Sequence, residues 1–240
     1  TNEVTFQIWG NADGVNDFYF DYIADGDVVE KMAKERADAI VNALPEGYLA
    51  DFSSEIYEGM VANSKHSTSL VAASLTAKYV ESFDNRTNLM KITTVNNDVT
   101  SKFGGFAINL PKAMPTDSGF TISFYIESTG SRALRIINPA SNSTAVSSKL
   151  EWAFEALDAA VGKWHTVFVP YSETYADATT VEFMFFMDKV AGTPGTNVIY
   201  IDGIYEGNVV DRLEEEKFKE TLDGLAATLP DGYLADFSSD

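Results

Sequence analysis

The sequence predicts an all-β fold, an antiparallel β-sandwich or jelly roll, with α-helices placed between sequence repeats. Ten short runs alternate apolar and polar residues and are separated by clusters of Gly, Pro, Asn, Asp and Ser, the pattern of strands joined by turns. Two other stretches space their apolar residues as an amphipathic helix does. A twelve-residue motif occurs twice, which indicates repeated units.

The strands are predicted from their alternation. In chain order they are Tyr48–Ser53, Ala77–Phe83, Asn88–Thr94, Gly104–Asn109, Gly119–Glu127, Ala133–Asn138, Leu150–Phe154, Trp164–Pro170, Val181–Met187 and Val198–Tyr205. The clearest is Gly119–Glu127, in which four apolar residues alternate with Thr121, Ser123, Tyr125 and Glu127. Ten short strands with no helix between them predict two packed antiparallel sheets.

The two helical stretches are Asp27–Leu44 and Asn208–Leu229. Each begins with a capping-box pattern, such as Asp27 followed by Glu30. Each ends at a Leu-Pro pair, because proline cannot continue a helix. Since an apolar stripe must be buried, we expect each helix to pack against a neighbouring sandwich.

The repeated motif divides the chain. It reads LPEGYLADFSSE at residues 44–55 and LPDGYLADFSSD at residues 229–240, with ten of twelve letters identical and two exchanges of Glu and Asp. We predict five segments. Residues 1–26 are the last strands of a preceding repeat, and residues 27–43 are an inter-repeat helix. Residues 44–207 form a complete sandwich repeat, residues 208–228 form a second inter-repeat helix, and residues 229–240 are the first strand of a further repeat.

Composition limits the partners. The 240 residues carry a formal net charge of −19 and include no cysteine. The charge argues against binding nucleic acid or anionic membrane surfaces, and the lack of cysteine excludes disulfides and thiolate metal sites. No apolar run approaches the roughly 20 residues of a membrane span, so we expect no membrane insertion.

No pattern of catalytic residues occurs. The sequence has two histidines, His66 and His165, but no Gly-x-Ser-x-Gly motif that would supply a nucleophilic serine. Phosphate-binding loops and the HExxH zinc motif are also absent from the sequence. A solvated or hydrogen-bonded histidine is the simpler interpretation of each. We therefore predict that the protein is not an enzyme.

A family resemblance rests on three stretches that follow one another. GKWHTVFVPYSE (Gly162–Glu173), TVEFMFFMDKVAG and NVIYIDGIYEG resemble the second half of jelly-roll carbohydrate-binding modules of the galactose-binding-like type. The resemblance covers Leu44–Gly207 and implies the same sandwich and a polysaccharide or other glycan as the partner.

The resemblance also implies a sugar platform, in which outward-facing aromatic side chains stack on pyranose rings. In Val181–Met187, alternation places Glu182, Met184 and Phe186 outward. We expect Phe186 to join Tyr125, Arg135 and Trp152 as sugar-binding residues. The alternative is that an inter-repeat helix covers them.

Many modules of this type hold a structural Ca²⁺ between the loop after the first strand and the acid of the closing strand. The matching positions are Asp51 or Glu55, and Asp202. Carboxylate oxygens suit Ca²⁺, although Asp202 alone can simply bond loop amides. Calcium is therefore an expected cofactor with a structural role.

Two functions follow from the sequence. The first is a non-catalytic tandem-repeat module of a secreted or cell-surface bacterial protein that binds a glycan. The alternative is a structural repeat of an extracellular stalk or filament with no small ligand. Its incomplete terminal sandwiches would pair head-to-tail by strand complementation between chains.

Overall fold

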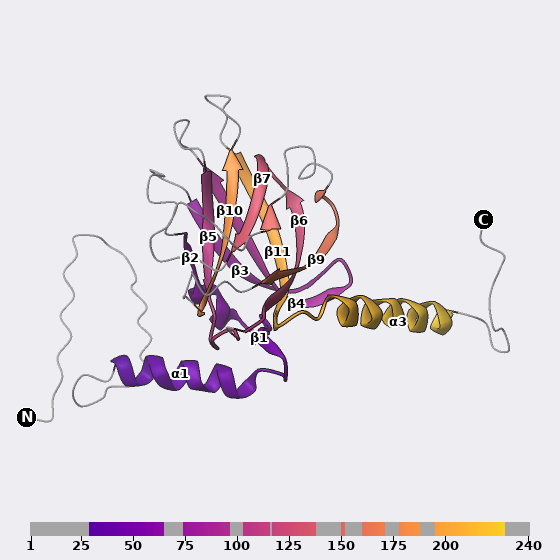
Figure 1. Cartoon of the computed structure of the whole chain (residues 1–240), viewed down its shortest axis with the longest axis horizontal. Coiled ribbons are helices and arrows are strands. Elements are labelled where there is room, and N and C mark those ends of the chain that lie inside the picture. The colour runs from indigo at the N-terminus through magenta and orange to yellow at the C-terminus, as the bar shows by residue number, and fades with distance from the viewer. Residues whose placement is uncertain are drawn as a thin grey trace, which may run out of the picture.

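The computed structural model of the chain is a β-sandwich flanked by two helices (Figure 1). It describes residues 29–64, 74–96, 103–115, 117–137, 150–151, 160–170, 178–187 and 195–228. All pairings between the described strands are antiparallel. The predicted antiparallel sandwich is therefore confirmed, while the predicted segments 1–26 and 229–240 lie outside the described residues.

Among the described residues, one sheet has six strands and the other has five. The six-stranded sheet holds β3 (Ser74–Phe83), β4 (Arg86–Asn96), β11 (Gly195–Glu206), β6 (Gly119–Ser128) and β9 (Trp164–Pro170) in that spatial order, with β1 (Tyr48–Ala50) also paired to β11. The five-stranded sheet holds β2 (Val61–Asn63), β5 (Phe103–Asn109), β10 (Thr180–Met187), β7 (Ser131–Ile137) and β8 (Leu150–Glu151). The sequence does not predict β2, because three residues are too few to show alternation.

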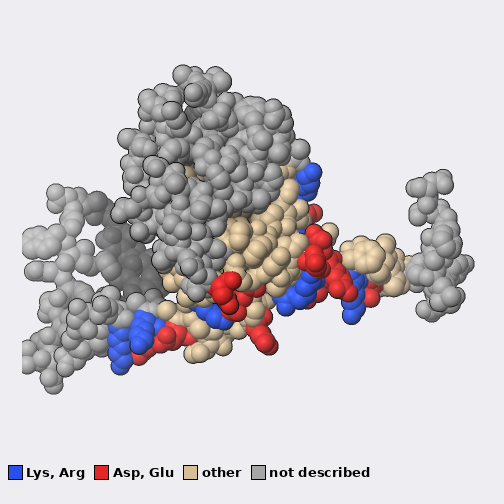
Figure 2. All heavy atoms as spheres, viewed as in Figure 1, with Lys and Arg blue, Asp and Glu red and all other residues tan. Residues whose placement is uncertain are grey.

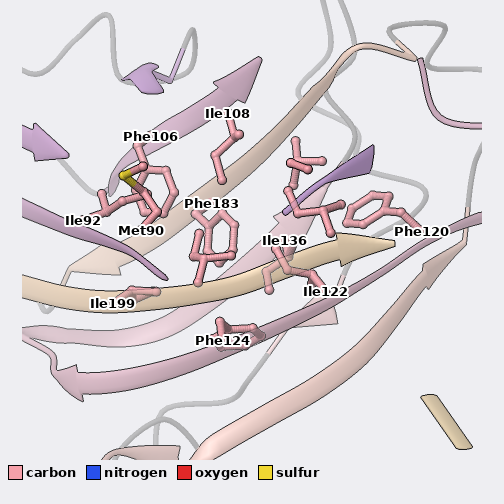
Figure 3. Close-up of a cluster of buried hydrophobic side chains, with 14 of the residues drawn as sticks. Met90, Ile92, Phe106, Ile108, Phe120, Ile122, Phe124, Ile136, Phe183 and Ile199 are labelled. Atoms are coloured by element: carbon pink, nitrogen blue, oxygen red, sulfur yellow. The ribbon is translucent and has the colours of Figure 1, made fainter. Parts of the chain in front are cut away.

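The core lies between the two sheets, as alternation in β6 predicts. Phe120, Ile122, Phe124 and Ile126 are all 0% exposed. In Figure 3, Phe124 from β6 and Phe183 from β10 lie in the same buried cluster, and their rings meet edge to face at 5.8 Å between centroids. Aromatic rings from both sheets therefore interlock across the sandwich.

The far side of the five-stranded sheet differs from expectation. The sequence places Glu182 and Met184 outward on β10, away from the core-facing Phe183. Both are nevertheless buried, with Glu182 at 0% and Met184 at 6% exposure. Alternation reports the direction in which a side chain leaves the strand, and it does not report whether another segment covers that side. This part of β10 is consequently not an open platform.

Two α-helices flank the sandwich at one end and extend to opposite sides in Figure 1. They are α1 (Val29–Ala43) and α3 (Val210–Thr228), and a short 3₁₀ helix, η1 (Glu55–Met60), follows β1. Ile40 near the end of α1 belongs to the buried core cluster. Leu213 in the first turns of α3 is also buried, so each helix is held to the sandwich by an apolar side chain.

Candidate functional site

The site begins at the tight hairpin between β3 and β4. Its two turn residues, Asp84 and Asn85, have φ angles of 49° and 61°, the positive values that a two-residue type I′ turn requires and that Asp and Asn tolerate. The hairpin sets Phe83 directly opposite Arg86. Asp84 Oδ2 also accepts a hydrogen bond of 2.9 Å from Trp164 Nε1 on β9.

A row of side chains crosses the outer face of the six-stranded sheet. Lys91 of β4 lies opposite Tyr200 of β11, Tyr200 lies opposite Tyr125 of β6, and Tyr125 lies opposite Trp164 of β9. Residues directly opposite each other in antiparallel strands project from the same face. Strand register therefore gathers three aromatic side chains that are widely separated in the sequence.

Phe83 completes what we name the aromatic cluster, Phe83, Tyr125, Trp164 and Tyr200. Its ring stacks on Tyr200 at 3.9 Å between centroids and 3° between planes, and it meets the edge of Tyr125 at 5.1 Å. Tyr125 and Trp164 are 5.5 Å apart. Tyr200 is buried and the other three are half-buried, so the cluster presents aromatic surface at the outer face.

Arg86 joins the aromatic cluster to an ion pair. Its Cζ lies 3.5 Å from the centre of the Trp164 ring, a cation–π arrangement. Its Nη1 donates to Asp202 Oδ2 at 2.5 Å and to Ser123 Oγ at 2.6 Å. Burial lowers the pKa of the Arg86 guanidinium, while the Asp202 carboxylate opposes that shift. The guanidinium is charged, because arginine side chains stay protonated in folded proteins.

Lys91 of β4 lies at the opposite end of the row from Trp164. Its Nζ donates to Tyr200 Oη at 2.7 Å and to Glu127 Oε2 at 3.1 Å. The hydrogen bond to Tyr200 is the main cause that raises the pKa of Lys91, and Glu127 adds to it. Glu127 itself is exposed, so charged groups border the aromatic surface on this side.

A groove runs beside Trp164, between the β3–β4 hairpin and α3. One part has a volume of about 530 Å³ and is lined by Asp84, Asn85, Arg86, Trp164, Lys217 and Glu220, among others. A second part of about 360 Å³ shares Asn85, Arg86, Lys217 and Glu220 and continues to Asp202 and Tyr205. We name these continuous hollows the polar groove.

Helix α3 supplies one wall of the polar groove. Lys217 Nζ lies 5.9 Å from the centre of the Trp164 ring. Burial, and then the positive charge of Arg86, lower the pKa of Lys217. Figure 2 shows acidic and basic atoms side by side where α3 leaves the sandwich. The polar groove thus offers amide, carboxylate, ammonium and guanidinium groups next to an indole ring, which can donate to and accept from hydroxyl groups.

The structure separates the residues that the sequence predicts to bind sugar. Tyr125 lies in the aromatic cluster. Arg135 lies on β7 and Phe186 on β10, so both belong to the five-stranded sheet, where Arg135 pairs with Met184. Trp152 lies outside the described residues. The partner of Tyr125 is instead Trp164, which sequence reasoning treats only as a strand residue, because its place depends on the pairing of β6 with β9.

Two of the three predicted calcium ligands already have protein partners. Asp51 Oδ1 accepts hydrogen bonds from Tyr57 Oη at 2.7 Å and Ser53 Oγ at 3.0 Å, and Asp202 pairs with Arg86. Glu55 is exposed at the start of η1. Within the described ranges, no group of three or more His, Cys, Asp or Glu side chains is placed to hold a metal ion. Calcium at Asp51, Glu55 and Asp202 stays a prediction.

A scan against protein-family models finds no match for the sequence, and a search of curated proteins also finds none. The structural neighbours are mostly jelly-roll carbohydrate-binding modules. A family 11 module from Clostridium thermocellum, in complex with a β-1,3-1,4-mixed-linked tetrasaccharide, is 15% identical with a TM-score of 0.34, and the match covers 68% of this chain and 97% of the module.

Two further solved structures show the range of the likeness. A xylan-binding domain of family 22 is 11% identical over 70% of this chain and 100% of the domain, with a TM-score of 0.39. An exo-β-agarase is 8% identical over 68% of this chain, with a TM-score of 0.41. This chain spans only 26% of the length of the agarase. The likeness concerns the arrangement of the strands.

None of the helices in the described part of the chain is long and apolar enough to cross a membrane.

Proposed function

We propose that the aromatic cluster and the polar groove form a glycan-binding site. In this proposal the chain is a non-catalytic, tandem-repeat module of a secreted or cell-surface bacterial protein. One observation carries the binding proposal, namely that Trp164 belongs both to the aromatic cluster and to the lining of the polar groove. The tandem arrangement is supported by the motif that recurs at residues 44–55 and 229–240.

The chemistry of a pyranose ring fits this combination. A sugar ring has an apolar face of C–H groups, which packs on aromatic side chains, and a rim of hydroxyl groups, each a donor and an acceptor. The aromatic cluster supplies the first kind of contact. Asn85 and Glu220 supply the second from opposite walls of the polar groove. Open sites of this kind gain little beyond desolvation, so we expect dissociation constants from micromolar to millimolar, about −8 to −4 kcal/mol.

The proposal is tested by titrating oligosaccharides selected on a glycan array into the full chain by calorimetry. Glu220→Ala removes an acceptor from the wall of the polar groove and should weaken binding about tenfold, about 1.4 kcal/mol. Glu214→Ala is the matched control, since Glu214 is an exposed acid of the same helix outside the lining of the polar groove. Equal affinities of the two variants would contradict the proposal.

The structural repeat remains the alternative function. Exposed large apolar side chains on α3 favour this alternative, because such side chains are suited to packing between neighbouring units. A folded chain that binds no glycan on the array, and whose α3 packs on a further unit, would favour this alternative.

A further inference from the structure

Helix α3 carries large apolar side chains that the sandwich does not cover. Phe218, Leu222 and Leu225 are 65%, 48% and 60% exposed. They follow one another at i, i+4 and i+7, which places them in one stripe along a helix of 3.6 residues per turn. We name Phe218, Leu222 and Leu225 the apolar stripe.

The apolar stripe faces away from the sandwich to which α3 is docked. Leu213 is buried, and Lys217 lies over Trp164. At 3.6 residues per turn, these two positions and Gly224 project more than about 100° away from the centre of the apolar stripe. Gly224 lines the polar groove. In its first turns α3 therefore has a partner in the sandwich on one side, and farther along it presents apolar surface on the other side.

The two helices can be aligned by the Leu-Pro pair that follows each of them, and in α1 this pair is followed by a described sandwich. Both α1 and α3 end one residue before a Leu-Pro pair, Leu44-Pro45 and Leu229-Pro230. Counted back from those pairs, Ile40 matches Leu225. Ile40 is only 9% exposed and belongs to the core cluster of the sandwich that follows it. Leu225 in the same helical position is 60% exposed.

Part of the surface that receives the end of α1 is repeated in the sequence. Ile40 and Leu44 lie in one apolar hollow with Ser53, Ser54 and Tyr57. Ser53 and Ser54 are part of the motif at residues 44–55, which recurs as residues 229–240. A sandwich opened by the second copy of the motif would hence present these two serines to α3 in the same way.

We propose that the apolar stripe binds a second sandwich unit of the same kind, the one that residues 229–240 open. In it, Leu225 occupies the place that Ile40 occupies in the sandwich described here. Phe218 and Leu222 widen the contact, because the matching residues of α1 are only Ala33 and Ala37. Helix α3 is then docked at both sides, so that successive units are joined by a fixed helix. This inference does not depend on glycan binding.

The test compares the 240-residue chain with a two-unit chain, in which residues 44–228 are added again after residue 228. The junction keeps the natural sequence except for the Glu and Asp exchanges of the motif. Hydrogen exchange of the amides in residues 218–228 is measured in both chains. We expect exchange at least tenfold slower in the two-unit chain, because packing against a second unit protects the helix from local opening.

Two matched variants of the first α3 in the two-unit chain locate the contact. Leu225→Asp should restore fast exchange at residues 218–228, and Leu225→Ala should give an intermediate rate. Ala227→Asp adds the same charge at an exposed position on the opposite side of α3 and should leave the protection in place. Fast exchange in the unmodified two-unit chain would overturn the proposal. Equal effects of Leu225→Asp and Ala227→Asp, or protection that appears only when molecules associate in light scattering, would also overturn it.

Discussion

The two faces of the six-stranded sheet are made by the same strands, yet they are filled in different ways. On β6 the inward residues Ile122 and Phe124 are fully buried in an apolar core. On the outward face, Ser123 is buried, Tyr125 is half-buried and Glu127 is exposed. The inner face is uniform, whereas the outer face changes along the strand from covered to open.

Hydrogen bonds to the outward side chains accompany this change in exposure along β6. Thr121 Oγ1 donates to the Gly207 carbonyl at 2.7 Å and accepts from the Val209 amide at 3.0 Å. Ser123 Oγ accepts from Arg86. The chain that leads into α3 therefore covers one end of the outer face and leaves the other end to the aromatic cluster. The inner face therefore supplies stability, and the half-open outer face leaves aromatic surface accessible.

The largest expected effect on stability comes from the inner face. Phe124→Ala should lower the free energy of unfolding by about 3–5 kcal/mol, because it removes a fully buried ring and leaves a cavity. Denaturant unfolding measures this loss. A loss below about 1 kcal/mol would show that the interior between the two sheets is not tightly packed, and the distinction between the faces would fail.

A smaller loss is expected at the covered end of the outer face. Asp202→Asn should cost about 2 kcal/mol, since it weakens a charge-assisted hydrogen bond from the mostly buried Arg86. Thermal unfolding with and without chelator separates this ion pair from the predicted calcium site. An ion pair alone predicts the same loss under both conditions. If Asp202 also holds Ca²⁺, chelator should lower the melting temperature of the unmodified chain and leave that of Asp202→Asn unchanged.

Much of the fold follows from local pattern, and much of the site does not. Alternation in Gly119–Glu127 correctly predicts that Phe120 and Phe124 face the core, because side chains of a strand point alternately to its two sides. It also indicates that Tyr125 faces outward. The neighbour of Tyr125 cannot be read in this way, since Trp164 meets it only through the antiparallel register of β6 and β9.

The walls of the site depend on still longer-range geometry. Lys217 and Glu220 are ordinary surface residues in the pattern of α3, and they enter the polar groove only because the helix lies beside the β3–β4 hairpin. Long-range geometry likewise keeps Arg135 and Phe186 away from Tyr125, because they lie on strands of the other sheet. Alternation identifies residues that face outward on each strand, but it does not say which of the two sheets a strand enters.

Trp164 is where the open end of the outer face meets the polar groove, so one substitution there tests the central claim most directly. A glycan array is probed with the labelled full chain and with Trp164→Ala at equal concentrations. Far-ultraviolet circular dichroism confirms that both are folded. We predict that the unmodified chain binds at least one class of glycan and that Trp164→Ala loses that signal at least tenfold. Binding that is unchanged in Trp164→Ala, or a folded chain that binds no glycan, would contradict the proposed site.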